Sequence, residues 1–332
     1  MREFNLIERL RERLPGAAPR LVLGSGDDAA VSVPGGATAT SVDAVVEGVH
    51  FRRGPGYEPE DVGAKALATA LSDLAAMGAE PGEAYVVLGV PPDAGEAELL
   101  RLADGLAEVA AASGVAVAGG DVSRSQVLSL AITVVGHAPS PQLMVTRAGA
   151  EPGDLLVLTG ELGGAAAGLL LLERPELEAA VAAETAANLK RRQLRPIARL
   201  RAGAALAAAG ARAMIDLSDG LAGDAAHLAA RSQVALAIDA TAIPLAKGLA
   251  EVAAAAGRDP LELAVSGGED YELLAAVPPQ RLSEAATRIG EAAETSLTPI
   301  GEVGAGAGAE IRLPGGGTLK SAGFDQLDRP PD

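Results

Sequence analysis

The chain has 332 residues, of which 48% are hydrophobic and only 2% aromatic, and its formal net charge is −17. This length is typical of about two domains with buried cores, and the hydrophobic content excludes a disordered protein. The acidic balance disfavours binding to nucleic acid or to anionic membranes, which relies on basic patches, and the absence of cysteine excludes disulfides, thiolate metal sites and cysteine nucleophiles.

The N-terminal segment MREFNLIERLRERL is charged and amphipathic. It lacks the apolar stretch and the small-residue cleavage site of a secretory signal. No run of about 18 uncharged apolar residues follows it anywhere in the chain, so we expect no membrane span. The sequence therefore predicts a soluble, cytoplasmic protein.

Strand-like and helix-like segments alternate along the first part of the chain. Runs rich in β-branched residues predict strands at 40–49, 83–91, 114–122 and 128–138. Composition and spacing predict helices at 60–79 and 94–114. The Pro/Gly-rich passage 139–154 then interrupts the pattern, and we place a domain boundary there, with domains at 1–138 and 139–332.

The same alternation resumes after the boundary. Strands are predicted at 155–160, 212–220, 234–240 and 271–278, and helices near 163–173, 195–209, 219–231 and 281–293. The run GAGAGAE at 304–310 is typical of a flexible surface turn. The expected fold class is α/β or α+β in two domains.

Several common catalytic motifs are missing. No lysine follows a glycine, so the phosphate-binding loop GxxxxGK[ST] is absent, and neither GxGxxG nor GxSxG occurs. The three histidines, His50, His137 and His227, are far apart in the sequence, and this spacing disfavours a zinc enzyme.

Carboxylates stand out instead, because they recur at strand ends and beside glycines. Asp27 and Asp28 adjoin in GSGDDAAV, and two such charges about 4 Å apart repel by roughly 4 kcal/mol at an effective dielectric near 20. Asp43 interrupts a strand-like run, although aspartate is depleted in strands. The other carboxylates of this kind are Asp73, Asp121, Asp216, Asp219, Glu269 and Asp270.

Each of these residues also has a structural interpretation. The aspartate pair could lie in a solvated turn. Asp73 shares one helical face with Lys65, Thr69 and Ser72, and this polar face could point to water. Either Ser218 or Asp219 could simply cap a helix.

Taken together, the carboxylates point to metal binding. Oxygen ligands without thiols or clustered histidines suit Mg²⁺, which bridges carboxylates to substrate phosphates. An acidic site holds a polyphosphate only where metal ions reverse the local charge. Arg147, in VTRAGA, is a candidate for direct phosphate contact, with a surface arginine at a domain junction as the alternative.

Seven segments in register resemble the thiamine-monophosphate kinase family: GSGDDAAV, SVDAVVEGVHF, KALATALSDLAAMGAEP, GGDVSRS, VTRAGAEPGD, IDLSDGLAGD and SGGEDYELL. The resemblance runs from residue 24 to about 327. This family belongs to a superfamily of ATP-dependent enzymes with aminoimidazole ribonucleotide synthetase and selenophosphate synthetase. It implies a synthetase-like architecture, in which an N-terminal mixed sheet with helices binds ATP and Mg²⁺ and forms a homodimer, and a C-terminal α/β domain completes the active site.

The resemblance also implies a reaction and a set of site residues. The γ-phosphoryl group of ATP would pass directly to thiamine monophosphate, with several Mg²⁺ ions, Asp43, Asp73, Asp121 and Arg147 carrying the chemistry. The nucleotide-contacting positions would be Gly120, Asp121, Arg147 and Ser218, and the substrate-contacting positions His50, Glu269 and Phe324. The implied metal ligands are Asp28, Ser41, Val42, Asp43, Asp73, Asp121, Asp216 and Asp219.

This chain departs from the family pattern at two places. Valine at position 42 could offer only its backbone carbonyl to a metal, where the family often has threonine. After Phe324 the chain reads DQL where the family often reads DHF. Two alternative functions stay open, namely another ATP-dependent synthetase of the superfamily and a non-catalytic sensor of Mg-nucleotide.

Overall fold

The structure is a computed structural model that describes residues 3–25, 29–292 and 295–319. Its contacts divide the chain into two compact units, residues 1–74 with 79–144 and residues 75–78 with 145–332. The first unit ends at Met144, within the Pro/Gly-rich passage that follows its last strand. No helix in the described parts of the chain is both long enough and apolar enough to cross a bilayer.

The first unit is built on a four-stranded mixed sheet with the strand order β3-β6-β4-β5. Strand β6 pairs antiparallel with β3 and β4, and β4 pairs parallel with β5. The predicted mixed sheet, its four strands and its two helices are confirmed. The elements are α1 (Glu3–Arg11), β1 (Leu21–Leu23), β2 (Val31–Ser32), β3 (Ala37–Val46), α2 (Pro59–Ala76), β4 (Glu80–Val90), α3 (Glu96–Ser113), β5 (Ala116–Arg124) and β6 (Ser129–Ala138).

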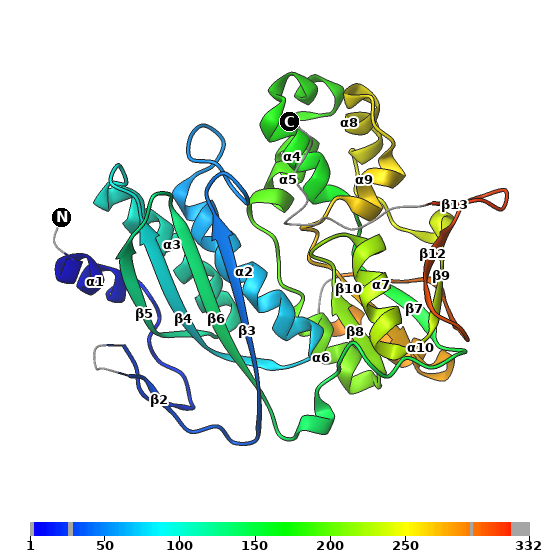
Figure 1. The fold of residues 1–332 in the computed structure, drawn as a ribbon, viewed down its shortest axis with the longest axis horizontal. Coiled ribbons are helices and arrows are strands. Elements are labelled where there is room, and N and C mark those ends of the chain that lie inside the picture. Colours follow the sequence, from blue (N-terminus) through cyan, green and yellow to red (C-terminus); the bar gives the residue numbers. More distant parts are fainter. Residues whose placement is uncertain (1–2, 26–28, 293–294, 320–332) are drawn as a thin grey trace. The chain divides into compact units, whose positions relative to one another are not determined.

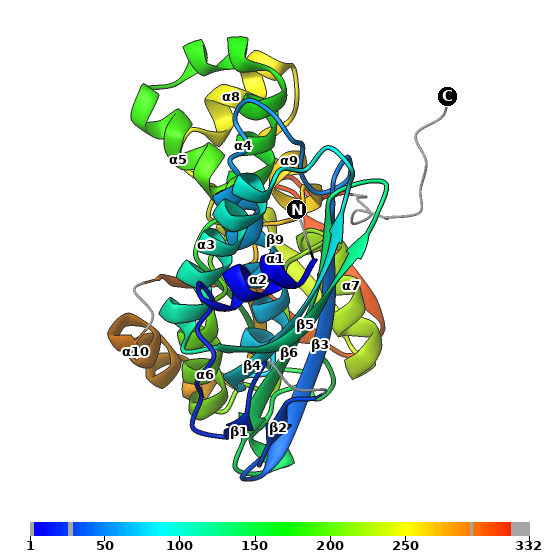
Figure 2. The same ribbon diagram turned by 90° about the vertical axis from the view of Figure 1, so that its left-hand side faces the viewer.

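Helices α2 and α3 cross closely because each presents a glycine at the crossing. A Cβ atom on Gly63 would collide with the carbonyl oxygen of Leu102, and one on Gly105 would collide with that of Glu60. Small residues at these positions let the two backbones approach each other. Figure 2 shows α1, α2 and α3 on one side of the sheet.

The other side of this sheet is open in the described part of the first unit. Strand register places Ala44, Ala131, Val87 and Asp121 in one cross-strand row on this side. The side chain of Val87 is 47% exposed, and that of Val42 is 63% exposed. An exposed sheet face of this kind is a surface on which another protein could pack.

The second unit is built on a seven-stranded sheet with the order β13-β12-β9-β11-β7-β10-β8. The pairings are antiparallel except for β12 with β9, which is parallel. The strands are β7 (Leu155–Thr159), β8 (Ala213–Asp216), β9 (Ala235–Asp239), β10 (Leu273–Val277), β11 (Leu297–Gly304), β12 (Gly308–Arg312) and β13 (Thr318–Leu319). The helices are α4 (Gly164–Glu173), α5 (Ala183–Leu194), α6 (Leu200–Ala209), α7 (Leu221–Ser232), α8 (Leu249–Ala256), α9 (Pro260–Ser266) and α10 (Leu282–Ala292), with short 3₁₀ turns at Pro141–Leu143, Pro175–Ala180, Ala240–Ala242 and Pro279–Arg281.

Helices cover both faces of this sheet, because successive strand residues point to opposite sides. Leu156 and Leu158 of β7 join a core with residues of α4, α5, α7, α8 and α9, whereas Val157 joins a second core with residues of α6 and α10. Figure 1 shows α4, α5, α8 and α9 grouped together, in agreement with the contacts between them. The predicted α/β architecture is therefore confirmed.

One expectation is wrong, and one of the two interpretations of the polar face of α2 is excluded. The run at 304–310 is not a turn throughout, because β12 begins at Gly308 and pairs with β9. This pairing gives hydrogen-bond partners to the backbone groups on the edge of β9 that faces β12. The polar face of α2 does not point to water, because Lys65, Thr69 and Ser72 are at most 7% exposed. Helices α5, α8 and α9 lie outside the helices that the sequence predicts.

Candidate active site

Strand β3 and helix α2 bring three predicted ligands of the first unit together. Ser41 and Asp43 project to the same side of β3, two residues apart, and both are partly buried. The Ser41 hydroxyl donates a hydrogen bond to Asp73 Oδ2 on α2. Val42 lies between them with its side chain exposed on the other side of the strand. The Val42 side chain therefore has neither the donor atom nor the direction to join this group.

Asp121 lies apart from these residues. The register pairs Asp121 with Val87 on the open side of the sheet, whereas Asp43 belongs to the neighbouring row with Ile132, Val86 and Gly120. The exposed Asp121 carboxylate accepts a 2.6 Å hydrogen bond from the Ser123 hydroxyl. The structure therefore does not place Asp121 on the same sheet face as Asp43.

Gly120 is required by the sheet itself. A Cβ atom at this position would collide with the carbonyl oxygen of Val86 on the neighbouring strand. For Gly120 the crowding comes from β4.

A cavity of about 1120 Å³ lies beside this edge of the sheet, within the first unit. Its wall combines apolar residues of α1, α3 and β5, such as Leu10, Leu106 and Val117, with Gly120 and Asp121. A large, mostly apolar hollow with a few polar groups at one end is the usual form of a small-molecule site. The cavity thus adjoins two of the predicted nucleotide-contacting residues.

His50 is fixed at the end of β3. Its Nδ1 accepts a 3.1 Å hydrogen bond from the backbone N–H of Val46, and its carbonyl oxygen accepts a 3.3 Å hydrogen bond from Lys65 Nζ. In a neutral imidazole with Nδ1 as acceptor, the ring proton resides on Nε2. These two hydrogen bonds hold the ring and the backbone of His50 in place.

The second unit gathers three carboxylates where β8 turns into α7. Asp216 ends β8 and Asp224 lies in the first turn of α7, and both are 3% exposed. The backbone N–H of Asp219 donates a 3.1 Å hydrogen bond to Asp224 Oδ2. Burial, followed by the negative charges of Asp216 and Asp219, raises the pKa of Asp224 to about 8, while the charge of Arg147 opposes this rise. Asp216 and Asp219 therefore lie close enough to Asp224 for their negative charges to act on its carboxyl group.

Ser218 and Asp219 do not cap α7. The residue that precedes the helix is Gly220, at φ = 100°, and it makes no side-chain capping bond. The capping interpretation of these two residues is therefore wrong, and both side chains stay partly exposed beside the carboxylate group.

Glu269 lies directly against this loop. Its backbone N–H donates a 2.8 Å hydrogen bond to the carbonyl oxygen of Ser218, and Tyr271 N–H donates a 2.9 Å bond to that of Leu217. The backbone of Glu269 is in the left-handed region at φ = 66°, which few non-glycine residues adopt. The structure thus brings a predicted nucleotide-contacting residue and a predicted substrate-contacting residue side by side within one unit.

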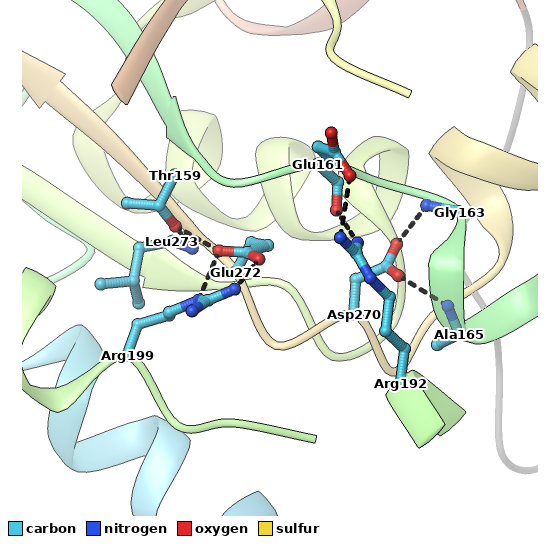
Figure 3. A network of polar contacts seen from close by, with 9 residues as sticks. All are labelled: Thr159, Glu161, Gly163, Ala165, Arg192, Arg199, Asp270, Glu272 and Leu273. Carbon is cyan, nitrogen blue, oxygen red and sulfur yellow. Dashed lines mark hydrogen bonds and ion pairs between the residues drawn. The ribbon is translucent and has the colours of Figure 1, made fainter. Parts of the chain in front are cut away.

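The carboxylates next to Glu269 serve the fold, as Figure 3 shows. Asp270 accepts hydrogen bonds from the backbone N–H groups of Gly163 (2.7 Å) and Ala165 (3.0 Å), which begin α4. Burial raises the pKa of Asp270 to about 7, although these two hydrogen bonds oppose the rise. Glu272, which is 2% exposed, forms an ion pair with Arg199 and accepts a 2.7 Å bond from the Thr159 hydroxyl.

The oxygen donors of each unit suit Mg²⁺ held jointly with phosphate. No three carboxylates or histidines among the described residues converge closely enough to hold a metal ion by themselves. Mg²⁺ usually keeps several waters and is held by one or two carboxylates plus substrate phosphates. Asp43 lies two residues from Ser41, which is bonded to Asp73, and Asp216 and Asp219 both lie near Asp224, so each unit would supply one or two carboxylates of this kind.

Two predicted residues, Asp28 and Phe324, lie outside the described residues. Two residues of the site were not predicted. Asp224 ends the segment IDLSDGLAGD, where its spacing from Asp216 and Asp219 could have revealed it. Gln193, whose side chain contacts Glu269, lies 76 positions away in the sequence and carried no local signal.

Family models match both parts of the chain. The N-terminal domain of AIR synthase related proteins matches residues 26–138, and the C-terminal domain matches residues 151–314. The thiamine-monophosphate kinase of Mycobacterium tuberculosis H37Rv is 39% identical over 276 residues, covering 82% of this chain and 80% of that protein. The enzyme of that name from Halobacterium salinarum is 38% identical over 295 residues, covering 89% and 92%.

Solved structures agree with these matches. The thiamine-monophosphate kinase of Stenotrophomonas maltophilia K279a superposes with a TM-score of 0.80 at 34% identity, covering 94% of this chain and 95% of that one. AaThiL complexed with AMPPCP and TMP has a TM-score of 0.77 at 31% identity, covering 98% and 96%. Escherichia coli HypE, at 20% identity and a TM-score of 0.76, shares the fold alone.

Proposed function

Since the chain belongs to the thiamine-monophosphate kinase family, we propose that it transfers the γ-phosphoryl group of ATP to thiamine monophosphate, giving thiamine diphosphate and ADP. The observation that supports this most is the contact between Ser218 and Glu269. It joins the predicted nucleotide position to the predicted substrate position beside the carboxylates Asp216 and Asp219. Phosphoryl transfer needs the two substrates to meet in this way.

In this proposal the first unit contacts ATP through Gly120 and Asp121, which line its cavity, and the second unit contacts ATP through Arg147 and Ser218. Asp43, Asp73 and Ser41 would hold Mg²⁺ in the first unit together with Asp28, and Asp121 would do so from the opposite face of the sheet. Asp216 and Asp219 would hold Mg²⁺ in the second unit. When bound, Mg²⁺ neutralises the phosphate charges and stabilises the charge on the transferring group. Val42 contributes no side-chain ligand.

The residues of the chain position the reactants rather than move protons. The nucleophile is a phosphate oxygen of thiamine monophosphate, which is already anionic at neutral pH, so a strong general base is unnecessary. The Ser41 hydroxyl holds the Asp73 carboxylate in place, and the exposed Arg147 guanidinium is suited to bidentate contact with a phosphate. The transfer is direct, in line and without a phosphoenzyme.

Glu269 and His50 recognise thiamine monophosphate, together with Phe324. A carboxylate suits the positively charged thiazolium ring and the amino group of the pyrimidine. The backbone N–H of Val46 donates to Nδ1 of His50 and holds the imidazole in place, and the ring would contact thiamine monophosphate in that orientation.

The enzyme acts as a homodimer that forms through the open sheet face of the first unit. Exposed Val42 and Val87 and the small residues beside them give this face the apolar character of an interface core. The cytoplasmic location stays a prediction of the sequence.

The test is incubation of the purified chain with ATP, Mg²⁺ and thiamine monophosphate, followed by chromatography for thiamine diphosphate and ADP in equal amounts. A parallel reaction with an aminoimidazole ribonucleotide precursor separates the kinase from a synthetase of the same fold. ADP formation only in that second reaction would overturn the proposal. Nucleotide binding without any turnover would instead favour a sensor.

A further inference from the structure

The side chain of Gln193 touches Glu269 across a long stretch of sequence. Gln193 Nε2 donates a 2.5 Å hydrogen bond to Glu269 Oε2. Gln193 lies near the C-terminal end of α5 and is 3% exposed, so its amide is held in the interior of the second unit. A buried amide of this kind adopts few rotamers, and its donor direction is therefore well defined.

The backbone on both sides of this contact is fixed. Helix α5 packs so tightly on α4 that a Cβ atom on Gly168 would collide with the carbonyl oxygen of Leu189. The neighbouring Arg192 forms a 2.8 Å ion pair with Glu161 just ahead of α4 (Figure 3). On the other side, Asp270 is bonded to the first turn of α4. Neither partner can shift far without breaking these contacts.

We propose that Gln193 is a positioning residue that orients the Glu269 carboxylate toward thiamine monophosphate. The inference rests on the proposed function, because it assumes that Glu269 meets this substrate. Gln193 acts through Glu269 and does not touch the reacting phosphates.

Because the amide of Gln193 is neutral, it can orient the Glu269 carboxylate without neutralising it. A lysine or arginine in its place would pair with Glu269 and compete with a cationic substrate for the same charge. A glutamine donor holds one carboxylate oxygen and brings no positive charge of its own. Hydrogen bonds to a carboxylate are also stronger than those between neutral groups, which suits a positioning role.

The test compares steady-state kinetics of wild type, Gln193→Leu and Gln193→Glu. The first variant removes the donor at similar size, and the second places a carboxylate against Glu269. We expect KM for thiamine monophosphate to rise about tenfold in both, since a hydrogen bond to a charged group is lost, while kcat and KM for ATP change less than twofold. Asn188→Ala, on the exposed side of the same helix, is the control and should leave all three constants unchanged.

The exchange variant Gln193→Glu/Glu269→Gln separates positioning from folding. It restores a hydrogen bond between the two side chains but moves the charge, so we expect the melting temperature to recover while KM for thiamine monophosphate stays high. Recovery of KM in the exchange variant, or an unchanged KM in Gln193→Leu, overturns the inference alone. A wild-type chain that forms no thiamine diphosphate overturns the proposed function and the inference with it.

Discussion

Arg199 and Glu272 lie 73 positions apart in the sequence and form a two-point ion pair in the second unit. Arg199 Nε lies 2.8 Å from Glu272 Oε2, and Nη2 lies 2.5 Å from Oε1. Glu272 is buried and follows Glu269 by three residues at the start of β10 (Figure 3). This pair therefore anchors the backbone between Glu269 and the start of β10 at Leu273.

Replacing Arg199 with methionine should destabilise the fold by about 3 kcal/mol, because Glu272 would be left as a buried charge without its cation. Urea denaturation measures the loss. Arg201→Met, an exposed position on α6, should change the free energy of unfolding by less than about 0.5 kcal/mol. The double variant Arg199→Met/Glu272→Met should be more stable than Arg199→Met alone, and equal stability of the two would contradict the role of the ion pair.

The raised pKa of Asp270 predicts a specific pH dependence of stability. Its folded-state value of about 7 lies above the ordinary 3.8, so the folded chain binds this proton more tightly than the unfolded chain. The contribution of Asp270 to stability is complete below about pH 4 and falls as the pH rises to about 7. Denaturation between pH 4 and 8 should show this fall in wild type and a smaller one in Asp270→Asn.

Asp239→Asn is the matched control for this pH series. The exposed Asp239 has a lowered pKa, chiefly because its carboxylate accepts hydrogen bonds from Thr241. Its removal should leave the slope between pH 5 and 8 as in wild type. Equal slopes in wild type and Asp270→Asn would show that Asp270 is already ionised at low pH.

Replacing Asp43 with asparagine should lower kcat for thiamine diphosphate formation by about 100-fold or more, because one charged ligand beside Asp73 and Ser41 is lost. The measurement is the initial rate at saturating ATP, Mg²⁺ and thiamine monophosphate. The melting temperature without Mg²⁺ should stay close to that of wild type. A variant that keeps most of its activity would show that Asp43 is not a required Mg²⁺ ligand.

Two substitutions of Asp224 should separate its charge from its hydrogen bond. Asparagine retains an oxygen that can accept from Asp219 N–H, whereas alanine removes it and should cost about 1–2 kcal/mol of stability. Mg²⁺ binding to the folded chain should raise the melting temperature of wild type. We expect this increase to shrink in Asp224→Asn, while stability without Mg²⁺ is kept. If Mg²⁺ raises the melting temperature of Asp224→Asn as much as that of wild type, the role of Asp224 is only to hold the loop that contains Asp219.

Replacing Val87 with arginine should disrupt the proposed homodimer, because it places a long charged side chain in the open sheet face. Sedimentation should show wild type at about twice the 33.0 kDa chain mass and the variant at the mass of one chain. Val22→Arg, at a 71% exposed position on β1, is the control and should sediment like wild type. A wild-type chain that sediments as a monomer would overturn the dimer.

The sequence by itself determined the local structure and the chemistry. Runs rich in β-branched residues predicted the four strands of the first unit's main sheet, because these residues favour extended backbone. The lack of cysteine and the recurring carboxylates indicated oxygen ligands for Mg²⁺. Seven short segments in register indicated the family to which the chain belongs. These features depend on residues that are close together in the chain, so they can be recognised from the sequence alone.

The tertiary structure decided which residues each carboxylate contacts and on which face of a sheet it lies. Glu269 and Asp270 adjoin in the sequence, yet one contacts Gln193 and the other holds the start of α4. Asp121 resembles Asp43 as a strand aspartate, but the register puts the two in different rows of the sheet. These outcomes depend on contacts between residues many positions apart, which form only when helices and strands pack, so no local pattern could have revealed them.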